Sequence, residues 1–435
     1  MSHMTRRELL KLLGVAGIAS TGAMGLPRAA FAAAKAHVVI IGGGIGGIAT
    51  AKYLRIINDQ VKITVIEPNS KYTFCPGSNE VLTGMPLSEF ERTYDHTMKR
   101  YNFKMVADKV NDIDFKAKTV KVAGGSSIKY DTLVVSPGPD FVFDDIEGYS
   151  EELASTKILH AWKAGKQTTM LRDQIAAMPD GGTLVIAPPG MPFRCPPAPY
   201  ERASFVAEHM KKQGRKGKII LLDNNIGFIF QNQYQHYWKK NFGYGTDNAM
   251  IEWVPGPGGA VKKVDAKKMT VTTKAGETIK ADVINIIPTN RANSLTIKTG
   301  LVEGKDKNWV EVNHHDMTSL VQPDVYVIGD TADFFVKTGY LASNQSKVVA
   351  QAIDDRLHGR EPGQPLYTNN CVAKASEADV GMAITDSFRE RNGKLVLQQT
   401  VQRPFPENYD NPFLNHVRAK VSDNWQRTFR RDIFD

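Results

Sequence analysis

A short glycine-rich stretch near the start of the chain constrains its fold more than any other feature. Residues 37–50 read HVVIIGGGIGGIAT: a β-branched run, then Gly42, Gly44 and Gly47 at GxGxxG spacing, then a run typical of a helix. In such a motif the first glycine makes a tight turn, the second lets the backbone approach a pyrophosphate, and the third lets the helix lie close to the strand. A second β-branched run ends at Glu67, which is placed to bind an adenosine ribose. GxGxxG alone also fits an ordinary turn, but with these flanks it predicts dinucleotide binding, and Glu67 favours FAD or NAD over NADP.

The first 32 residues have the pattern of an export signal. Arginines at positions 6 and 7 precede an apolar run over residues 12–26, and Ala30-Phe31-Ala32 is a small-x-small cleavage site. This is the twin-arginine type of signal, which predicts a periplasmic mature protein. The alternative, an amphipathic first helix, is disfavoured by four glycines. No later apolar run reaches the length needed to span a bilayer.

Composition narrows the class of partner. With 435 residues, 42% hydrophobic and 23% charged, the chain is expected to form a globular protein of two or three domains. The formal net charge is +9, and the signal contributes part of it. Because no clustered basic stripe is present, the remaining charge suits an acidic protein partner or a small anionic substrate at least as well as nucleic acid.

The strand–helix–strand pattern recurs in the middle of the chain without its glycines. Thr183–Ala187 predicts a strand, Tyr200–Lys212 a helix and Lys218–Asp223 a strand. Between the first strand and the helix lies PPGMPFRCPPAP, residues 188–199, which we call the proline frame. Proline supplies no backbone amide to a phosphate, so a second dinucleotide is not expected here. The proline frame instead surrounds Cys195.

The other segments predict a return to the first nucleotide fold. The expected elements are a small antiparallel piece over Ile113–Val122 and Ile128–Val135, a turn at Gly138, a helix over Ile158–Met178, a hairpin over Val261–Lys280, a strand over Val283–Pro288, a strand over Asp324–Ala332 and a helix opening at Ser343–Lys347. Asp330, at the tip of its strand, could accept a hydrogen bond from a ribityl hydroxyl. The following helix N-terminus, with Lys347, could stabilise negative charge on a reduced flavin.

These motifs together carry a family resemblance. GxGxxG with Glu67, the segment Val134–Gly138 and the segment Val327–Asp330 resemble the flavoprotein disulfide reductases. Phe74-Cys75-Pro76-Gly77, Arg194–Glu201 and the late Cys371 resemble the flavin-binding subunit of flavocytochrome c sulfide dehydrogenase. The resemblance implies an α/β fold with two Rossmann-like dinucleotide domains and a C-terminal α+β interface domain. The expected division is 1–32 signal, 33–148 with 290–362 FAD domain, 149–289 second Rossmann-like domain, and 363–435 C-terminal domain.

The resemblance also implies roles for the three cysteines. It places a covalent FAD, held through its 8α-methyl group, on Cys75, and a redox-active disulfide between Cys195 and Cys371. Three cysteines in an oxidising compartment leave one over after pairing, which is consistent with a thioether. From the residues alone, a small buried hydrophobe is the better interpretation of Cys75, and the pair could be a structural bridge closing a long loop.

Sulfide oxidation is the activity that the resemblance implies. Sulfide would attack the disulfide at Cys195, with Cys371 facing the flavin. Glu201 would act as the acid or base for the sulfide proton. Glu201 could instead simply complement the dipole of its helix. A separate c-type cytochrome subunit would take the electrons, because the chain has no CxxCH motif for a haem of its own. Trp425 would lie near the flavin or at that interface, and no metal site is expected.

Three rivals stay open. A sulfide:quinone oxidoreductase would share the disulfide chemistry but needs an apolar or amphipathic membrane-binding terminus, for which Asn424–Asp435 is a weak candidate. An NAD(P)H-dependent disulfide reductase is disfavoured by the proline frame. A non-catalytic flavoprotein partner would keep the cysteines but would not be reduced by sulfide.

Overall fold

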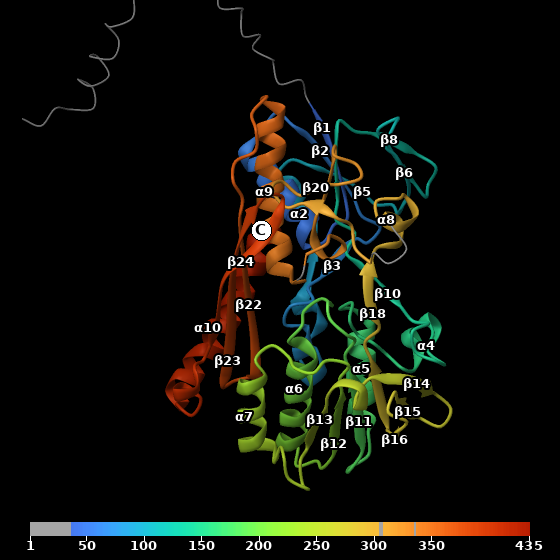
Figure 1. The fold of residues 1–435 in the computed structure, drawn as a ribbon, viewed down its shortest axis with the longest axis vertical. Coiled ribbons are helices and arrows are strands. Elements are labelled where there is room, and N and C mark those ends of the chain that lie inside the picture. The colour runs from blue at the N-terminus through green and yellow to red at the C-terminus, as the bar shows by residue number, and fades with distance from the viewer. Residues whose placement is uncertain (1–35, 304–307, 335) are drawn as a thin grey trace, which may run out of the picture. The chain divides into compact units, whose positions relative to one another are not determined.

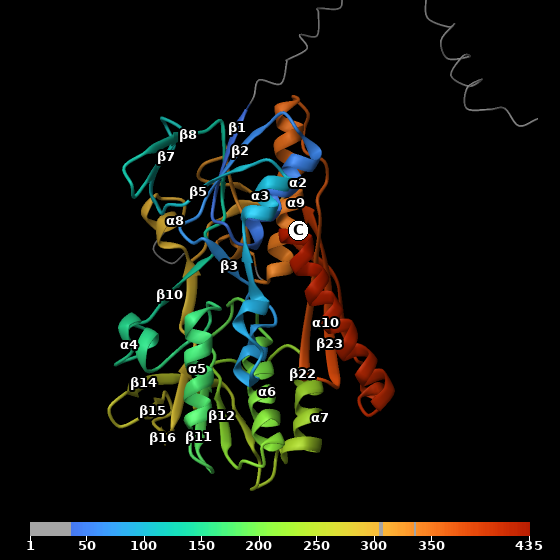
Figure 2. The same cartoon turned by 180° about the vertical axis from the view of Figure 1, so that it is seen from behind.

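The structure is a computed structural model, and it describes residues 36–303, 308–334 and 336–435. The expected export signal over residues 1–32 lies outside the described residues. Figures 1 and 2 show the described chain from opposite sides, with a largely parallel first sheet, a parallel second sheet, and a C-terminal sheet and helix.

The glycine-rich stretch folds as its pattern predicts. It forms β1 (His37–Ile41), α2 (Ile45–Ile57) and β2 (Lys62–Ile66). β1 is parallel both to β2 and to β9 (Thr132–Val135), and its residues after His37 are buried. A strand covered on both faces needs such a continuous apolar run. The glycine turn therefore lies at the carboxyl end of an interior strand, where open α/β sheets bind their ligands.

Segments from distant parts of the sequence complete this first sheet. Its strand order is β19–β20–β21–β9–β1–β2–β5. The added strands are β5 (Lys104–Val106), β19 (Val312–Asn313), β20 (Thr318–Ser319) and β21 (Val325–Val327). After β21 comes α9 (Gly339–Leu357), which packs against α2. The helix therefore begins one turn earlier than the expected start at Ser343.

Short elements fill the region between β2 and β9. They are β3 (Lys71–Thr73), β4 (Glu91–Thr93), the 3-10 helices η1 (Ser78–Thr83) and η2 (Leu87–Phe90), α3 (Asp95–Arg100), β6 (Val110–Asp114), β7 (Thr119–Val122) and β8 (Ser127–Lys129). β6, β7 and β8 form the expected antiparallel piece. The prediction that this piece continues to Val135 is wrong, because the apolar Thr132–Val135 enters the buried parallel sheet as β9.

The second sheet repeats the same construction. Its order is β13–β12–β11–β17, with all pairs parallel. The elements are α5 (Lys166–Ala177), β11 (Thr183–Ala187), α6 (Ala198–Lys212), β12 (Lys218–Leu222), α7 (Gln231–Phe242), β13 (Ile251–Val254), η3 (Gly256–Gly258), β14 (Val261–Asp265), β15 (Thr270–Thr273), β16 (Thr278–Lys280) and β17 (Val283–Ile286). β14, β15 and β16 form an antiparallel sheet instead of the single expected hairpin.

Two antiparallel strands connect the sheets. The chain leaves the first sheet after Gly138, which has φ +77°, through β10 (Pro139–Val142). It returns through β18 (Thr289–Ala292), which pairs with β10 and leads into α8 (Ser294–Lys298). The predicted α/β fold class is confirmed, whereas the exact domain boundaries stay a prediction.

The helix expected over Ile158–Met178 is only half correct. α4 (Glu151–Thr156) ends before this range, and α5 begins at Lys166. The residues between them are not helical. The carbonyl oxygens of His160 and Ala161 accept hydrogen bonds from Arg202 at 3.2 and 2.9 Å, and Ala161 has φ +44°. The carbonyl oxygens of this segment therefore accept hydrogen bonds from a side chain of α6 and not from a helix that the segment itself would form.

The C-terminal region is an antiparallel sheet followed by one long helix. β22 (Leu366–Ser376), β23 (Val380–Arg391) and β24 (Lys394–Arg403) precede η5 (Pro406–Asn408) and α10 (Pro412–Phe434). The end of α10 returns to the first sheet, where Tyr53 donates to the Asp432 carboxylate and Phe434 stacks on Tyr72. Among the described residues, no helix has the length and apolar character needed to cross a membrane.

Candidate functional site

The turn between β1 and α2 is closed tightly on itself. Gly42 has φ +102°, and a Cβ atom there would lie 2.2 Å from the Ser136 carbonyl oxygen. A Cβ on Gly47 would lie 1.9 Å from the Gly42 carbonyl oxygen, so α2 approaches β1 only because Gly47 has no side chain. At Gly44 the atom nearest to an added Cβ is in the Tyr72 ring, at 3.5 Å. This last position is therefore open toward the space above the turn.

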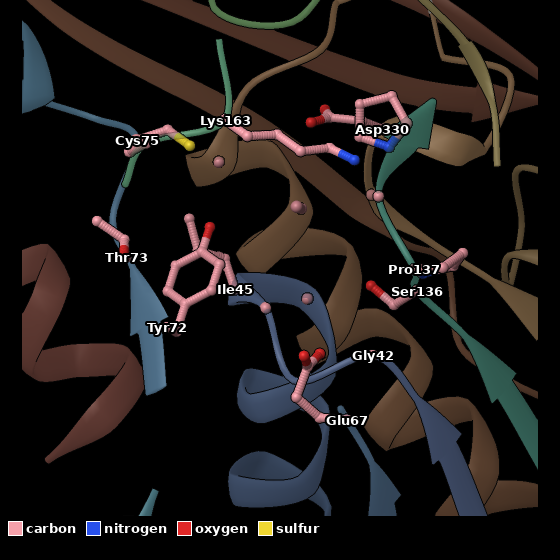
Figure 3. Close-up of a pocket in the computed structure, with 18 of the residues that line it drawn as sticks. Gly42, Ile45, Glu67, Tyr72, Thr73, Cys75, Ser136, Pro137, Lys163 and Asp330 are labelled. Atoms are coloured by element: carbon pink, nitrogen blue, oxygen red, sulfur yellow. The ribbon is translucent and has the colours of Figure 1, made fainter. Parts of the chain in front are cut away.

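A cavity of about 420 Å³ lies over the turn, and Figure 3 shows side chains that face it. The lining includes the predicted cofactor residues Gly42, Gly44, Glu67, Cys75, Gly138 and Asp330. An adjoining cavity of about 550 Å³ shares Gly42 and Glu67 and continues along Lys109 and Lys298. The two cavities together form a long site that runs from the end of β2 to Cys75.

Glu67 is held by the backbone around it. Its carboxylate accepts hydrogen bonds from the Gly43 amide at 2.8 Å and the Asn69 amide at 3.0 Å. It also lines both cavities. A ribose hydroxyl entering this space would meet a fixed acceptor, as the spacing predicts.

Asp330 places a carboxylate on the same cavity. It lies in the 3-10 turn η4 (Gly329–Thr331) directly after β21 and faces the cavity (Figure 3). Among the described residues, none donates a hydrogen bond to its side chain or forms an ion pair with it. Burial raises the pKa of Asp330, although Arg194 and Lys337 oppose the effect. A ribityl hydroxyl would supply the missing donor, so the glycine turn, Glu67 and Asp330 fit a flavin dinucleotide.

Cys75 faces the same cavity from the turn after β3. Nη2 of Arg194 donates a hydrogen bond to its Sγ atom and another to the Trp162 carbonyl oxygen, the latter at 2.6 Å. Arg194 belongs to the proline frame, where it directly precedes Cys195. The sequence shows this arginine beside a cysteine, but only the fold shows that it reaches Cys75.

Cys195 and Cys371 line one small cavity of about 40 Å³. Cys195 has φ +56°, and its amide donates to the Lys337 carbonyl oxygen at 2.8 Å, while Cys371 lies in β22. All three cysteines are partly buried free thiols. The disulfide between Cys195 and Cys371 stays a prediction, which the shared cavity supports. Burial, followed by nearby Cys371 and Glu201, raises the pKa of Cys195; burial also raises the pKa of Cys371, to about 12.

Glu201 lines the same small cavity from the first turn of α6. Its side chain is 6% exposed, and it accepts hydrogen bonds from Asn79 Nδ2 at 2.8 Å and the Lys374 amide at 3.0 Å. Burial raises the pKa of Glu201 to about 7 in spite of these bonds. A carboxyl group that titrates near neutrality beside two cysteines is suited to proton transfer.

Sequence patterns did not single out the residues that hold Glu201. Asn79 is fixed in turn by Arg202, whose Nε donates to its Oδ1 at 3.2 Å. Lys374 is anchored through Nζ to Glu80 at 2.5 Å and Asp423 at 2.9 Å. These residues come from four separate segments, and no local spacing links them.

The structure places Lys347 away from both cavities. It lies in the third turn of α9, where its Nζ is 3.4 Å from Asp432 and lies 4.6 Å from the centre of the Tyr53 ring. The expected contact of Lys347 with a flavin is therefore not supported. The N-terminus of α9 does reach the cavity, but through Gly339.

The ligand edge of the second sheet is occupied by its own side chains. Asp223 follows β12, where a nucleotide domain often carries its ribose-binding carboxylate. Here Asp223 is fully buried and accepts hydrogen bonds from Tyr200 at 2.6 Å, Trp253 at 2.8 Å and the Asn225 amide at 2.9 Å. No acceptor is left for a ribose. Within the described ranges, no cluster of His, Cys, Asp or Glu side chains could hold a metal ion either.

Two sheets built around parallel strands, a glycine cradle and a separate cysteine pair define a flavoprotein of the disulfide reductase class. Comparisons with known proteins agree. A family model described as pyridine nucleotide-disulphide oxidoreductase matches residues 36–175, and the model of the central domain of the sulfide dehydrogenase [flavocytochrome c] flavoprotein chain matches residues 168–288. The chain belongs to the flavoprotein disulfide reductase superfamily, as a relative of flavocytochrome c sulfide dehydrogenases and sulfide:quinone oxidoreductases.

Individual relatives include both sulfide:quinone oxidoreductases and a flavocytochrome c flavoprotein chain. Sulfide-quinone reductase of Aquifex aeolicus is 25% identical over 374 residues, which cover 80% of this chain and 83% of that protein. The sulfide dehydrogenase [flavocytochrome c] flavoprotein chain of Chlorobaculum thiosulfatiphilum is 48% identical over 45 residues, which cover 10% of this chain and 94% of that sequence. The solved sulfide:quinone oxidoreductase of Aquifex aeolicus matches with a TM-score of 0.69 at 21% identity, covering 91% of this chain and 92% of that one. That structure supports the fold.

Proposed function

We propose that this chain is the flavoprotein of a sulfide dehydrogenase, which oxidises sulfide through Cys195, Cys371 and a bound FAD. The observation that carries the proposal is the small cavity shared by Cys195, Cys371 and Glu201. It joins two sulfur atoms and a proton acceptor in a space too small for a bulky organic disulfide. When bound, FAD supplies a two-electron acceptor for the cysteine pair.

The residues divide the chemistry between sulfur and carboxylate. Hydrosulfide attacks the Cys195–Cys371 disulfide at Cys195, so a new S–S bond forms there and Cys371 leaves as a thiolate. The Glu201 carboxylate takes the sulfide proton. Burial makes the Cys371 thiolate costly, as its raised pKa indicates, and this favours passing its electron pair onward. The net change is from HS⁻ to zero-valent sulfur, one proton and two electrons.

The proposal includes a thioether between Cys75 and the 8α-methyl group of FAD. Its support is the position of Cys75 on the dinucleotide cavity, together with the Phe74–Gly77 motif. With Cys75 engaged in this way, Cys195 and Cys371 are left to form the disulfide.

The proposed electron acceptor is a separate c-type cytochrome subunit, in the periplasm. Support comes from the central-domain model over residues 168–288 and from the short match to a flavocytochrome c flavoprotein chain. The twin-arginine pattern in residues 1–32 supports the location. The partner would dock partly on the C-terminal region, near Trp425, which lines the cysteine cavity.

Quinone is the second candidate acceptor, and one surface feature favours it. Phe413, Val417 and Val421 are 74%, 40% and 59% exposed and are spaced four residues apart on α10, so they form one apolar stripe. A membrane-bound quinone reductase would use such a helix at the lipid interface. The relatives that match over most of the chain are also sulfide:quinone oxidoreductases.

Anaerobic reduction by sulfide tests the proposed activity. Excess sulfide should bleach the flavin absorbance of the purified protein within one turnover, whereas Cys195→Ser and Cys371→Ser should each slow bleaching by at least about 100-fold. Unchanged bleaching in either variant, or no bleaching of the wild type, would contradict the sulfide mechanism. The second result would favour the non-catalytic flavoprotein.

The acceptor and the linkage are tested separately. Sulfide-dependent reduction of cytochrome c should exceed reduction of a soluble ubiquinone analogue in the presence of liposomes, and the reverse order would favour the quinone enzyme.

Acid denaturation should leave the flavin on the Cys75 peptide. Free flavin would remove the thioether from the proposal and rank the quinone enzyme first.

A further inference from the structure

Arg194 carries a guanidinium group whose contacts are not explained by sulfide oxidation. Its backbone is fixed on both sides: its amide donates to Asn290 Oδ1 at 3.2 Å, and its carbonyl oxygen accepts from Trp162 Nε1 at 3.2 Å. From this position Nη2 reaches Cys75 Sγ and the Trp162 carbonyl oxygen. Three contacts, one with Asn290 and two with Trp162, therefore hold Arg194 so that its guanidinium reaches the Cys75 sulfur.

Within the described part of the chain, Arg194 forms no salt bridge. The Asp330 carboxylate lies on the same cavity and acts on Arg194 through its charge, but it makes no hydrogen bond with it. Burial acts to lower the pKa of Arg194, but Cys75, Asp330 and Tyr72 raise it above its ordinary value. The guanidinium thus stays charged, with a cysteine sulfur as its hydrogen-bond acceptor.

We propose that Arg194 promotes the covalent attachment of FAD by stabilising negative charge on Cys75 Sγ while the thioether forms. This inference rests on the thioether in the proposed function and assigns to Arg194 a role in forming that bond. The Cys75 S–H bond and one C–H bond of the 8α-methyl group break, and an S–C bond forms. Two protons and two electrons leave, and dioxygen accepts them as hydrogen peroxide.

The assignment gives the proline frame a second task. Arg194 and Cys195 are consecutive, so a single rigid segment holds the cation on the attachment cysteine and places the next residue in the sulfide cavity. The frame thereby fixes both sulfur sites relative to one bound cofactor.

Arg194→Met and Arg194→Lys test the inference, with Cys75→Ser as the variant that cannot be linked. Each protein is purified with its flavin and denatured in acid, and flavin on the polypeptide is measured against flavin released. Arg194→Met should keep total flavin within twofold of wild type but lose at least tenfold of its linked fraction. Arg194→Lys should be linked more slowly than wild type, because the charge remains without the planar fork. Adding methylguanidine and dioxygen to Arg194→Met should restore linkage over time.

Lys163→Met is the matched control. Its ammonium group lines the same cavity, but it forms no hydrogen bond with Cys75. Linkage in this variant should stay within twofold of wild type, which would separate a direct contact from general positive potential. The inference is overturned if Arg194→Met is linked as fully as wild type, or if it loses bound and linked flavin together, because Arg194 would then only hold the cofactor. Release of all flavin from the wild type would instead refute the thioether, while the sulfide-bleaching test would still judge the activity.

Discussion

Glu201 accepts a hydrogen bond from the backbone amide of Lys374 at 3.0 Å, three residues beyond Cys371 on the same strand. Glu201 itself lies in the first turn of the helix that follows Cys195. One carboxylate thus ties together the two segments that bring the cysteine pair into a common cavity. Its protonation is coupled both to the chemistry and to the packing of this junction.

Glu201→Gln should slow anaerobic flavin bleaching by sulfide about 100-fold at pH 8, because the proton acceptor is lost. In the wild type the rate should rise with pH through about 7, where the buried carboxyl loses its proton. The variant should lack this rise, and stopped-flow measurements from pH 6 to 8 would show it. Glu208→Gln is a suitable control, since Glu208 lies on the same helix but bonds to Ser376. Equal pH profiles for wild type and Glu201→Gln would exclude the role.

The same carboxyl group should make stability depend on pH. Because its folded-state pKa, about 7, lies above the ordinary value of 4.5, the folded protein binds more protons than the unfolded chain between these values. The free energy of unfolding should therefore fall as pH rises through this interval, by up to about 3 kcal/mol. Urea titrations at pH 4.5, 6 and 8 should show that the free energy of unfolding of Glu201→Gln rises relative to that of wild type by this amount as the pH increases. A constant difference between the two proteins would contradict the assignment.

Two glycines of the same turn should respond differently to alanine. Gly47→Ala places a Cβ 1.9 Å from a backbone oxygen, so the protein should lose soluble expression or unfold at least 10 °C lower. Gly44→Ala meets only the Tyr72 ring, at 3.5 Å, and should leave the apoprotein melting temperature within about 2 °C. Its flavin content after purification should nevertheless fall several-fold, because the Cβ faces the cavity. Full flavin occupancy in Gly44→Ala would show that no pyrophosphate lies over this turn.

NADH should not reduce the flavin. Asp223 is saturated by Tyr200, Trp253 and Asn225, and the proline frame offers few amides to phosphate. Under anaerobic conditions, 1 mM NADH or NADPH should leave the flavin spectrum unchanged over an hour in a sample that sulfide bleaches at once. Rapid bleaching by either nucleotide would instead favour an NAD(P)H-dependent disulfide reductase.

Phe434→Ala should destabilise the first sheet as well as the helix that carries it. Phe434 is 2% exposed and lies 5.6 Å from Tyr72 and 5.5 Å from Phe74 between ring centres. Removing it should cost about 3 kcal/mol in the free energy of unfolding and should loosen bound flavin, because Tyr72 lines the cavity. Phe413→Ala, on the same helix but 74% exposed, should change stability by less than about 0.5 kcal/mol. Similar losses in both variants would contradict this packing.

Local patterns predicted both nucleotide folds because their signals are carried by neighbouring residues. A buried parallel strand needs a continuous apolar run, and a phosphate turn needs glycine at fixed spacing, so β1, α2, β2, β11 and α6 follow from the sequence. The prediction of a helix over Ile158–Met178 is wrong where distant groups decide the conformation. Residues 158–165 are not helical, and the His160 and Ala161 carbonyl oxygens accept hydrogen bonds from Arg202. Lys347 likewise lies beside Asp432 near the end of α10, so its predicted contact with a flavin lacks support.

The sequence by itself determined the class of fold, the dinucleotide cradle and the three cysteines as the reactive candidates. Only the tertiary structure decided what surrounds them. Arg194 donates a hydrogen bond to Cys75. Asn79 and the Lys374 amide donate hydrogen bonds to Glu201. Tyr200 and Trp253 donate to Asp223, which occupies the ligand edge of the second sheet. The physical reason is that glycine spacing and apolar runs act through the local backbone, whereas burial, hydrogen bonding and pKa depend on groups that meet only after the chain has folded.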